Sequence, residues 1–134
     1  MMLGRLAIGA VLVGGFAAAQ TLDFEVYRTK VEPIFMKKRG AHARCVSCHS
    51  ASNSAFKLQE LPHGATGWTE EQSRMNFTSV SKLVVAGDPL KSRLLKHPLA
   101  QDAGGDLFHN GGRQFTSQDD PDWKTIADWI RGGH

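Results

Sequence analysis

Cysteine is scarce in this sequence, with only two among 134 residues. A structural zinc site takes about four ligands in paired spacings, whereas this chain offers a single closely spaced pair. A thioredoxin-like redox pair lies within a βαβ pattern, and no such pattern surrounds these cysteines. A pair separated by two residues is also an unusual choice for a structural disulfide. The cysteines therefore point to a different chemistry.

The chain also has no long hydrophobic run, internal repeat or low-complexity segment. Its apolar stretch at residues 6–16 is short against the roughly 20 residues of a membrane-spanning helix. Arg5 precedes this stretch and small residues 17–19 follow it, which is the pattern of a secretory signal. We therefore expect residues 1–19 to be a signal peptide and residues 20–134 to be one domain that is periplasmic or otherwise exported. Membrane association would require the signal to stay uncleaved.

Neither basic nor acidic residues are present in large excess. The chain has 16 basic and 13 acidic residues, with a pI of about 9.1. There is no long basic run and no interleaved aromatic stripe, so the composition argues against a nucleic-acid partner. The small excess of positive charge is compatible with docking to an acidic partner.

What the sequence does contain is the run Cys45-Val46-Ser47-Cys48-His49. Two cysteines at this spacing with a histidine directly after the second are typical of a covalent c-type haem attachment site. Each thiol can add to one haem vinyl group, and the histidine then becomes the proximal ligand of the iron. We therefore predict one covalently attached haem c, held by Cys45, Cys48 and His49.

A six-coordinate iron needs a second axial ligand, and a methionine opposite histidine gives a higher potential than a second histidine. Met36 and His42 lie too close in sequence to the haem motif to reach the other haem face comfortably. We favour His109, because it lies in a glycine-rich loop that lets the backbone approach a flat cofactor closely. Met75 is the runner-up and His97 is third.

Helical patterns account for most of the remaining chain. Pro33 should bend or end the first helix, and charged residues such as Glu32 fall outside its apolar stripe. A short helix in the middle of the chain should bury Leu90 together with Leu94 and Leu95. The sequence therefore predicts an all-α fold with four helices. The first covers residues 22–38, and the second covers residues 70–80 after a capping box of Thr69 and Gln72. A short third helix runs from Pro89 to about His97 with Asp88 as its cap, and the last begins at Asp120 and Pro121 and ends at Gly132.

These features resemble a single-haem cytochrome c domain, and more narrowly the planctomycete-type cytochrome c domains. Three runs carry the narrower resemblance: Val-Glu-Pro-Ile-Phe at residues 31–35, Ala-Gly-Asp-Pro-Leu-Lys-Ser-Arg-Leu-Leu at 86–95, and Ile-Ala-Asp-Trp-Ile at 126–130. The resemblance implies a cytochrome c-like fold in which the N- and C-terminal helices pack together around one covalently bound haem. Those domains commonly carry a Met-Pro-Pro loop before the last helix, where this chain has Phe-His-Asn-Gly-Gly at residues 108–112. This departure favours ligation by His49 and His109, with a lower potential.

The expected function is that of a monohaem cytochrome that carries single electrons between redox partner proteins, without acting as an enzyme. The basic group formed by Lys37, Lys38, Arg39 and Arg44 is either a solvated helix end or a collar that steers acidic partners. The alternative is a haem enzyme or sensor, in which peroxide or a small gas binds an open distal site and His109 acts as an acid-base group.

Residue type also suggests which side chains would contact the haem propionates and the ring of His49. Trp68, Arg74 and Arg93 are candidates for contacts with the haem propionates, because arginine suits paired carboxylate oxygens. An acidic side chain, a backbone carbonyl or water should hold the second ring nitrogen of His49 and tune its basicity.

Overall fold

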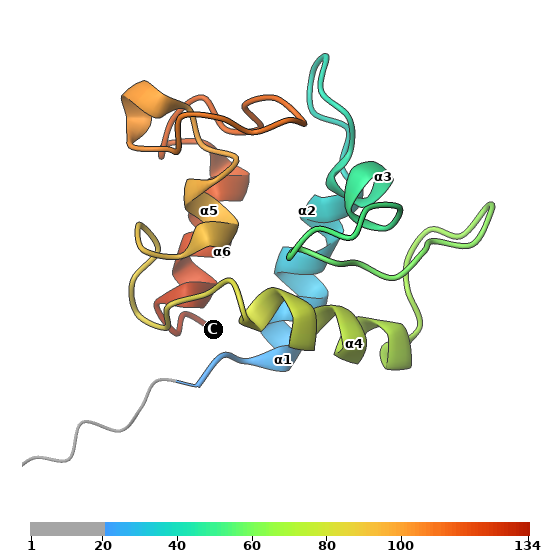
Figure 1. The fold of residues 1–134 in the computed structure, drawn as a ribbon. Helices are drawn as coiled ribbons and strands as arrows, with labels where there is room; N and C mark the ends of the chain where they lie inside the picture. The colour runs from blue at the N-terminus through green and yellow to red at the C-terminus, as the bar shows by residue number, and fades with distance from the viewer. Residues whose placement is uncertain (1–20) are drawn as a thin grey trace, which may run out of the picture.

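The computed structural model describes residues 21–134, and helices joined by long loops make up this part of the chain (Figure 1). No β-strand occurs in residues 21–134, which contain only two isolated β-bridges. The predicted all-α class is therefore confirmed, whereas the predicted signal peptide, residues 1–19, lies outside the described residues. The elements are α1 (Phe24–Val26), the π-helix η1 (Tyr27–Val31), α2 (Glu32–Met36), α3 (Cys45–His49), α4 (Glu70–Ser81), α5 (Arg93–Lys96), the 3-10 helix η2 (Gln101–Ala103) and α6 (Pro121–Ile130).

The first helix runs from α1 through η1 into α2, so Pro33 does not end it. The five residues before Glu32 wind as a π-helix, in which the N–H of Glu32 bonds to the carbonyl of Tyr27. This wider turn just ahead of Pro33 gives the proline ring room that a regular α-helical turn would deny. The helix begins two residues after the predicted start at residue 22 and ends two residues before the predicted end at residue 38.

The helices α4 and α6 begin at the predicted caps. The hydroxyl of Thr69 accepts the N–H of Gln72, and the side chain of Gln72 accepts the N–H of Thr69, which completes the capping box of α4. The carboxylate of Asp120 accepts two backbone N–H groups in the first turn of α6. Both interactions satisfy helix N–H groups that have no partner within the helix.

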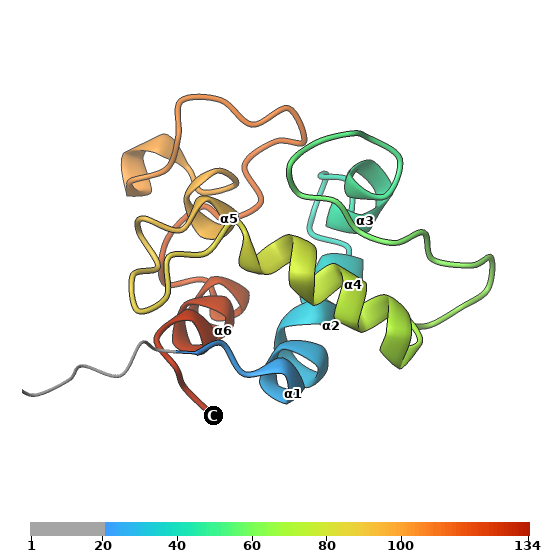
Figure 2. The same cartoon turned by 60° about the horizontal axis from the view of Figure 1, so that its bottom comes forward.

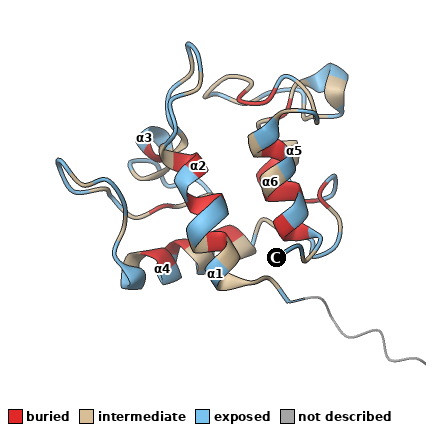
Figure 3. Ribbon diagram, turned by 180° about the vertical axis from the view of Figure 1, so that it is seen from behind, coloured by how far each residue is buried: buried red, intermediate tan, exposed pale blue. Residues whose placement is uncertain are grey.

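The first and last helices pack against each other. The indole N–H of Trp129 on α6 donates to the backbone carbonyl of Asp23 at 2.8 Å, and its ring lies 5.5 Å from that of Tyr27 on η1. Figure 2 shows α4 lying across the first helix, and Figure 3 shows that buried residues occur on α2, α4, α5 and α6 alike. One core therefore joins elements from both ends of the described chain.

The carboxylate of Glu32 is buried in this core, although the apolar pattern placed it outside the stripe. Its oxygens accept hydrogen bonds from the hydroxyl of Ser73 at 2.6 Å and the amide of Asn76 at 3.0 Å, both on α4. A third bond comes from the hydroxyl of Tyr27 at 3.3 Å. These three donors offset the cost of removing a charged group from water.

The short helix α5 begins later than predicted, because residues 89–91 form a turn and Arg93 is its first residue. The buried hydroxyl of Ser92 donates to the carbonyl of Asp88 at 2.8 Å, which closes the chain into a turn before the helix starts. The predicted helix start at Pro89 was therefore wrong. Leu90 is 46% exposed, whereas Leu94 and Leu95 are buried as predicted.

No helix within residues 21–134 is long and apolar enough to cross a membrane.

Candidate haem site

The haem motif forms a helix of its own, α3, and its functional side chains share one face. Cys45 and Cys48 are three positions apart, and Cys45 and His49 are four apart, which are the spacings that bring helical side chains together. Both thiols are free. All three side chains line one cavity of about 380 Å³, a volume within the range of small-molecule and cofactor sites.

A second part of the chain brings two further imidazoles to the same cavity, those of His97 and His109. The ring centroids of His49 and His109 lie 6.4 Å apart, and their planes differ by 17°. The rings of His97 and His109 lie 5.0 Å apart and are nearly perpendicular, at 85°. Three of the chain's six histidines therefore meet here.

Hydrogen bonds set the tautomers of His49 and His109. Nδ1 of His49 lies 2.8 Å from the carbonyl oxygen of Phe56, and Nδ1 of His109 lies 2.6 Å from that of Gly112. Because a carbonyl oxygen can only accept, each Nδ1 carries the proton and each Nε2 keeps its lone pair. A metal-ligating histidine commonly has this arrangement.

Burial favours the uncharged form of both imidazoles. It lowers the pKa of His49 and the pKa of His109 below the usual histidine value, although the hydrogen bonds to Phe56 and Gly112 oppose the shift. A neutral imidazole is the form that binds a metal. Burial likewise raises the pKa of the Cys45 thiol to about 11, so that this thiol stays protonated at neutral pH.

The rest of the cavity wall is mainly apolar, and its side chains come from segments spread over the whole described chain. They are Ile34, Phe35, Phe56, Leu83, Leu94, Pro98, Phe115 and Ile126. Such walls, with a few polar groups among them, are typical of small-molecule and cofactor sites.

Two arginines at the cavity are charged and exposed, Arg44 and Arg93. Arg93 was among the predicted propionate partners, whereas Arg44 was considered only as part of the basic group. The other two candidates point elsewhere: the indole N–H of Trp68 donates to the carbonyl of Gln59 at 3.0 Å, and Arg74 pairs with a glutamate on its own helix. Of the predicted propionate partners, only Arg93 lines the cavity.

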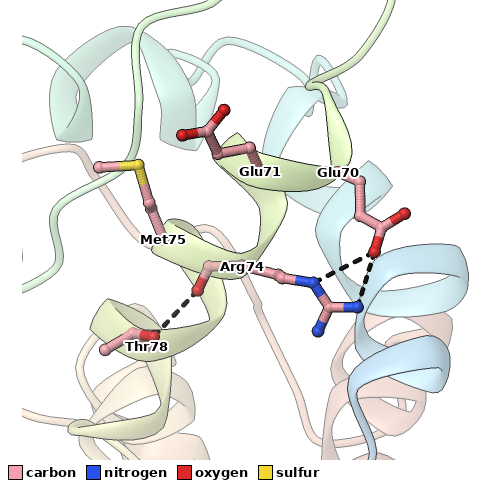
Figure 4. Close-up of a pocket in the computed structure, with 5 residues that line it drawn as sticks. All are labelled: Glu70, Glu71, Arg74, Met75 and Thr78. Carbon is pink, nitrogen blue, oxygen red and sulfur yellow. Dashed lines mark hydrogen bonds and ion pairs between the residues drawn. The ribbon is translucent and has the colours of Figure 1, made fainter.

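Met75 lies away from the cavity. Its side chain is 52% exposed, and on the outer surface of α4 it lines a shallow depression with four polar neighbours (Figure 4). His97 instead lines the cavity itself, so of the two runner-up candidates only His97 lies near His49. The sequence could not reveal this, because the direction in which Met75 points depends on which face of α4 packs against the first helix.

The basic group of residues 37–44 is largely engaged within the protein. The guanidinium of Arg39 bonds to the carboxylates of Asp120 and Asp122, and Lys37 bonds to Asp122 at 2.8 Å. Arg39 also lies over the ring of Phe115, 4.6 Å from its centroid. These contacts hold the segment before the haem motif against the start of α6. Of the four cations, only Arg44 lines the cavity.

Residues 21–134 contain no group of three or more His, Cys, Asp or Glu side chains that could hold a metal ion. Comparisons of the chain with protein-family models, curated proteins and solved structures found no match in any of the three. The functional argument therefore rests on the residues of the cavity.

Proposed function

We propose that the chain is an exported monohaem c-type cytochrome, with a cytochrome c-like fold, that carries single electrons between redox partners. The observation that carries this proposal is the pairing of His49, from the haem motif, with His109 at one cavity that the two motif cysteines also line.

The spacing of the two imidazoles fits a shared metal atom. A metal–imidazole bond is about 2.0–2.1 Å long, so two imidazoles that shared one metal atom would have ring centroids roughly 6 Å apart. The centroids of His49 and His109 are 6.4 Å apart. With each Nδ1 occupied by a carbonyl and each Nε2 available, this distance supports ligation by both residues.

The two cysteines provide the covalent attachment. Each thiol would add its S–H bond across one vinyl double bond of the haem, with sulfur bonding to one carbon and hydrogen to the other. No atom is lost and no oxidant is required. Because Cys45, Cys48 and His49 lie on one face of α3, two bonds to the ring edge and one ligand to the metal can form from a single helical turn.

When bound, the haem supplies a one-electron couple between ferrous and ferric iron. His49 and His109 would hold the metal from two segments of the chain, and the apolar wall would restrict water. Two imidazole ligands give a lower potential than histidine with methionine. The exposed guanidinium groups of Arg44 and Arg93 suit the haem propionates or an acidic partner.

Expression in a host that attaches haem to exported proteins tests the proposal. We expect a mass increase of one haem that survives denaturation, and its loss in the Cys45→Ala/Cys48→Ala variant. Reduced wild-type protein should resist carbon monoxide, because His49 and His109 would both bind the iron. Rapid carbon monoxide binding would instead favour the alternative, a haem enzyme or sensor with an open distal site.

A further inference from the structure

A third imidazole of the cavity has no role in the proposed function. His97 follows directly after α5, and its Nδ1 lies 3.0 Å from a carboxylate oxygen of Asp106. Its ring centroid is 5.0 Å from that of His109. His97 therefore lies beside the proposed distal ligand, within the same cavity.

The bond to Asp106 prepares His97 for metal binding. The other oxygen of the Asp106 carboxylate lies 3.7 Å from the ammonium group of Lys96. An ionised carboxylate can only accept, which places the proton on Nδ1 and leaves Nε2 of His97 with a lone pair. His49 and His109 have the same tautomer. A carboxylate partner, however, makes an imidazole a stronger electron donor to a metal than a carbonyl partner does.

The protein holds the imidazoles of His97 and His109 with different firmness. His109 follows Leu107 and Phe108, which are 77% and 68% exposed, so little apolar burial anchors this part of the loop. His97 follows the buried Leu94 and Leu95. Segments with little buried apolar surface open most readily, so the loop that carries His109 should leave the cavity before α5 does.

We propose that His97, oriented by Asp106, is a second distal ligand that binds the haem iron when His109 leaves it. This inference rests on the proposed function. It gives the cavity two six-coordinate forms, each with two imidazole ligands. The form with His97 should have the lower potential, because the carboxylate partner increases electron donation from the ring.

Four proteins test this inference: wild type, His97→Ala, His109→Ala and the double variant. Electron paramagnetic resonance and absorption spectra of the oxidised proteins report the spin state, and carbon monoxide binding to the reduced proteins reports an open site. We expect both single variants to stay low-spin and the double variant to become high-spin and bind carbon monoxide. His109→Ala should also have a lower potential than wild type.

Two further variants separate ligation by His97 from a general structural effect. His63 is exposed and does not line the cavity, so His63→Ala/His109→Ala should remain low-spin. Asp106→Asn in the His109→Ala background should raise the potential or release part of the iron to the high-spin form, because the amide is a weaker acceptor. The same change in the wild-type background should leave the spectrum unaltered.

The possible failures have different meanings. A high-spin His109→Ala protein that binds carbon monoxide would overturn the role of His97 and leave the proposed function intact. A low-spin double variant would overturn the assignment to His97 and also the one to His109. Absence of covalent haem from the wild-type protein would contradict the proposed function itself.

Discussion

The hydroxyl of Tyr27 lies 3.3 Å from a carboxylate oxygen of Glu32, and both side chains are buried. The same carboxylate binds Ser73 and Asn76 of α4. A buried carboxylate therefore joins the first helix to α4 through three hydrogen bonds. Because each donor depends on this one acceptor, the group is sensitive to substitution.

Replacement of Glu32 by alanine should be strongly destabilising. It leaves the hydroxyls of Tyr27 and Ser73 and the amide of Asn76 without their acceptor, at a cost of about 1–3 kcal/mol for each buried group that stays unsatisfied. We expect a total loss of about 2–4 kcal/mol in the free energy of unfolding, measured by urea denaturation. Glu71→Ala, at an exposed position of α4, is the control and should change stability by less than about 0.5 kcal/mol. Equal effects of the two variants would show that the hydrogen bonds contribute little.

Stability should fall at alkaline pH through Tyr27, the only tyrosine in the chain. Burial raises the pKa of Tyr27 well above its usual value of 10.0, and the neighbouring carboxylate of Glu32 adds to the shift. The folded state thus favours the neutral phenol. Its contribution to stability is complete below about pH 10 and is lost as the pH rises from there toward the folded-state pKa.

Denaturant titrations at about pH 8 and about pH 11 test this expectation. Wild type should lose more stability between the two values than Tyr27→Phe, which cannot ionise at that position. Glu32→Gln should show an intermediate loss, because burial, the largest cause of the shift, remains. An identical alkaline loss in wild type and Tyr27→Phe would contradict the prediction.

Arg39→Lys should destabilise the protein even though the charge is kept. The side chain of Arg39 is 13% exposed, bonds to two carboxylates and lies over Phe115. Lysine lacks the planar fork that makes these contacts together, so we expect a loss of about 1–3 kcal/mol, measured by chemical denaturation. Arg74→Lys is a matched control, because Arg74 also lies over a ring, that of Phe24, but pairs with Glu70 at an exposed site. This variant should lose less than about 0.5 kcal/mol.

Met75→Ala should leave the haem spectra and the potential unchanged. The side chain is 52% exposed and lines a surface depression apart from the cavity. Absorption spectra and a redox titration beside wild type provide the measurement, and stability should change by less than about 0.5 kcal/mol. A change of spin state in this variant would place Met75 at the iron and remove His109 from it.

Features that depend on neighbours in sequence were predicted well. The caps at Thr69 and Asp120 bind N–H groups within three residues of themselves, so the local sequence contains all the partners. The start of α5 was predicted wrongly even though the residues that decide it are also close together in sequence. Asp88 before Pro89 has the pattern of a cap, but the buried hydroxyl of Ser92 closes a turn there that the pattern does not reveal.

The sequence by itself determined the all-α class, the capped helices and the motif of Cys45, Cys48 and His49, because helix periodicity, caps and motif spacing depend only on residues close together in sequence. Only the tertiary structure decided which side chains share the motif's cavity. It brought His97 and His109 there and turned Met75 outward. The physical reason is that these positions depend on how α4, α5 and the loop before α6 pack on the first helix, and such long-range packing is not encoded in any one short stretch of sequence.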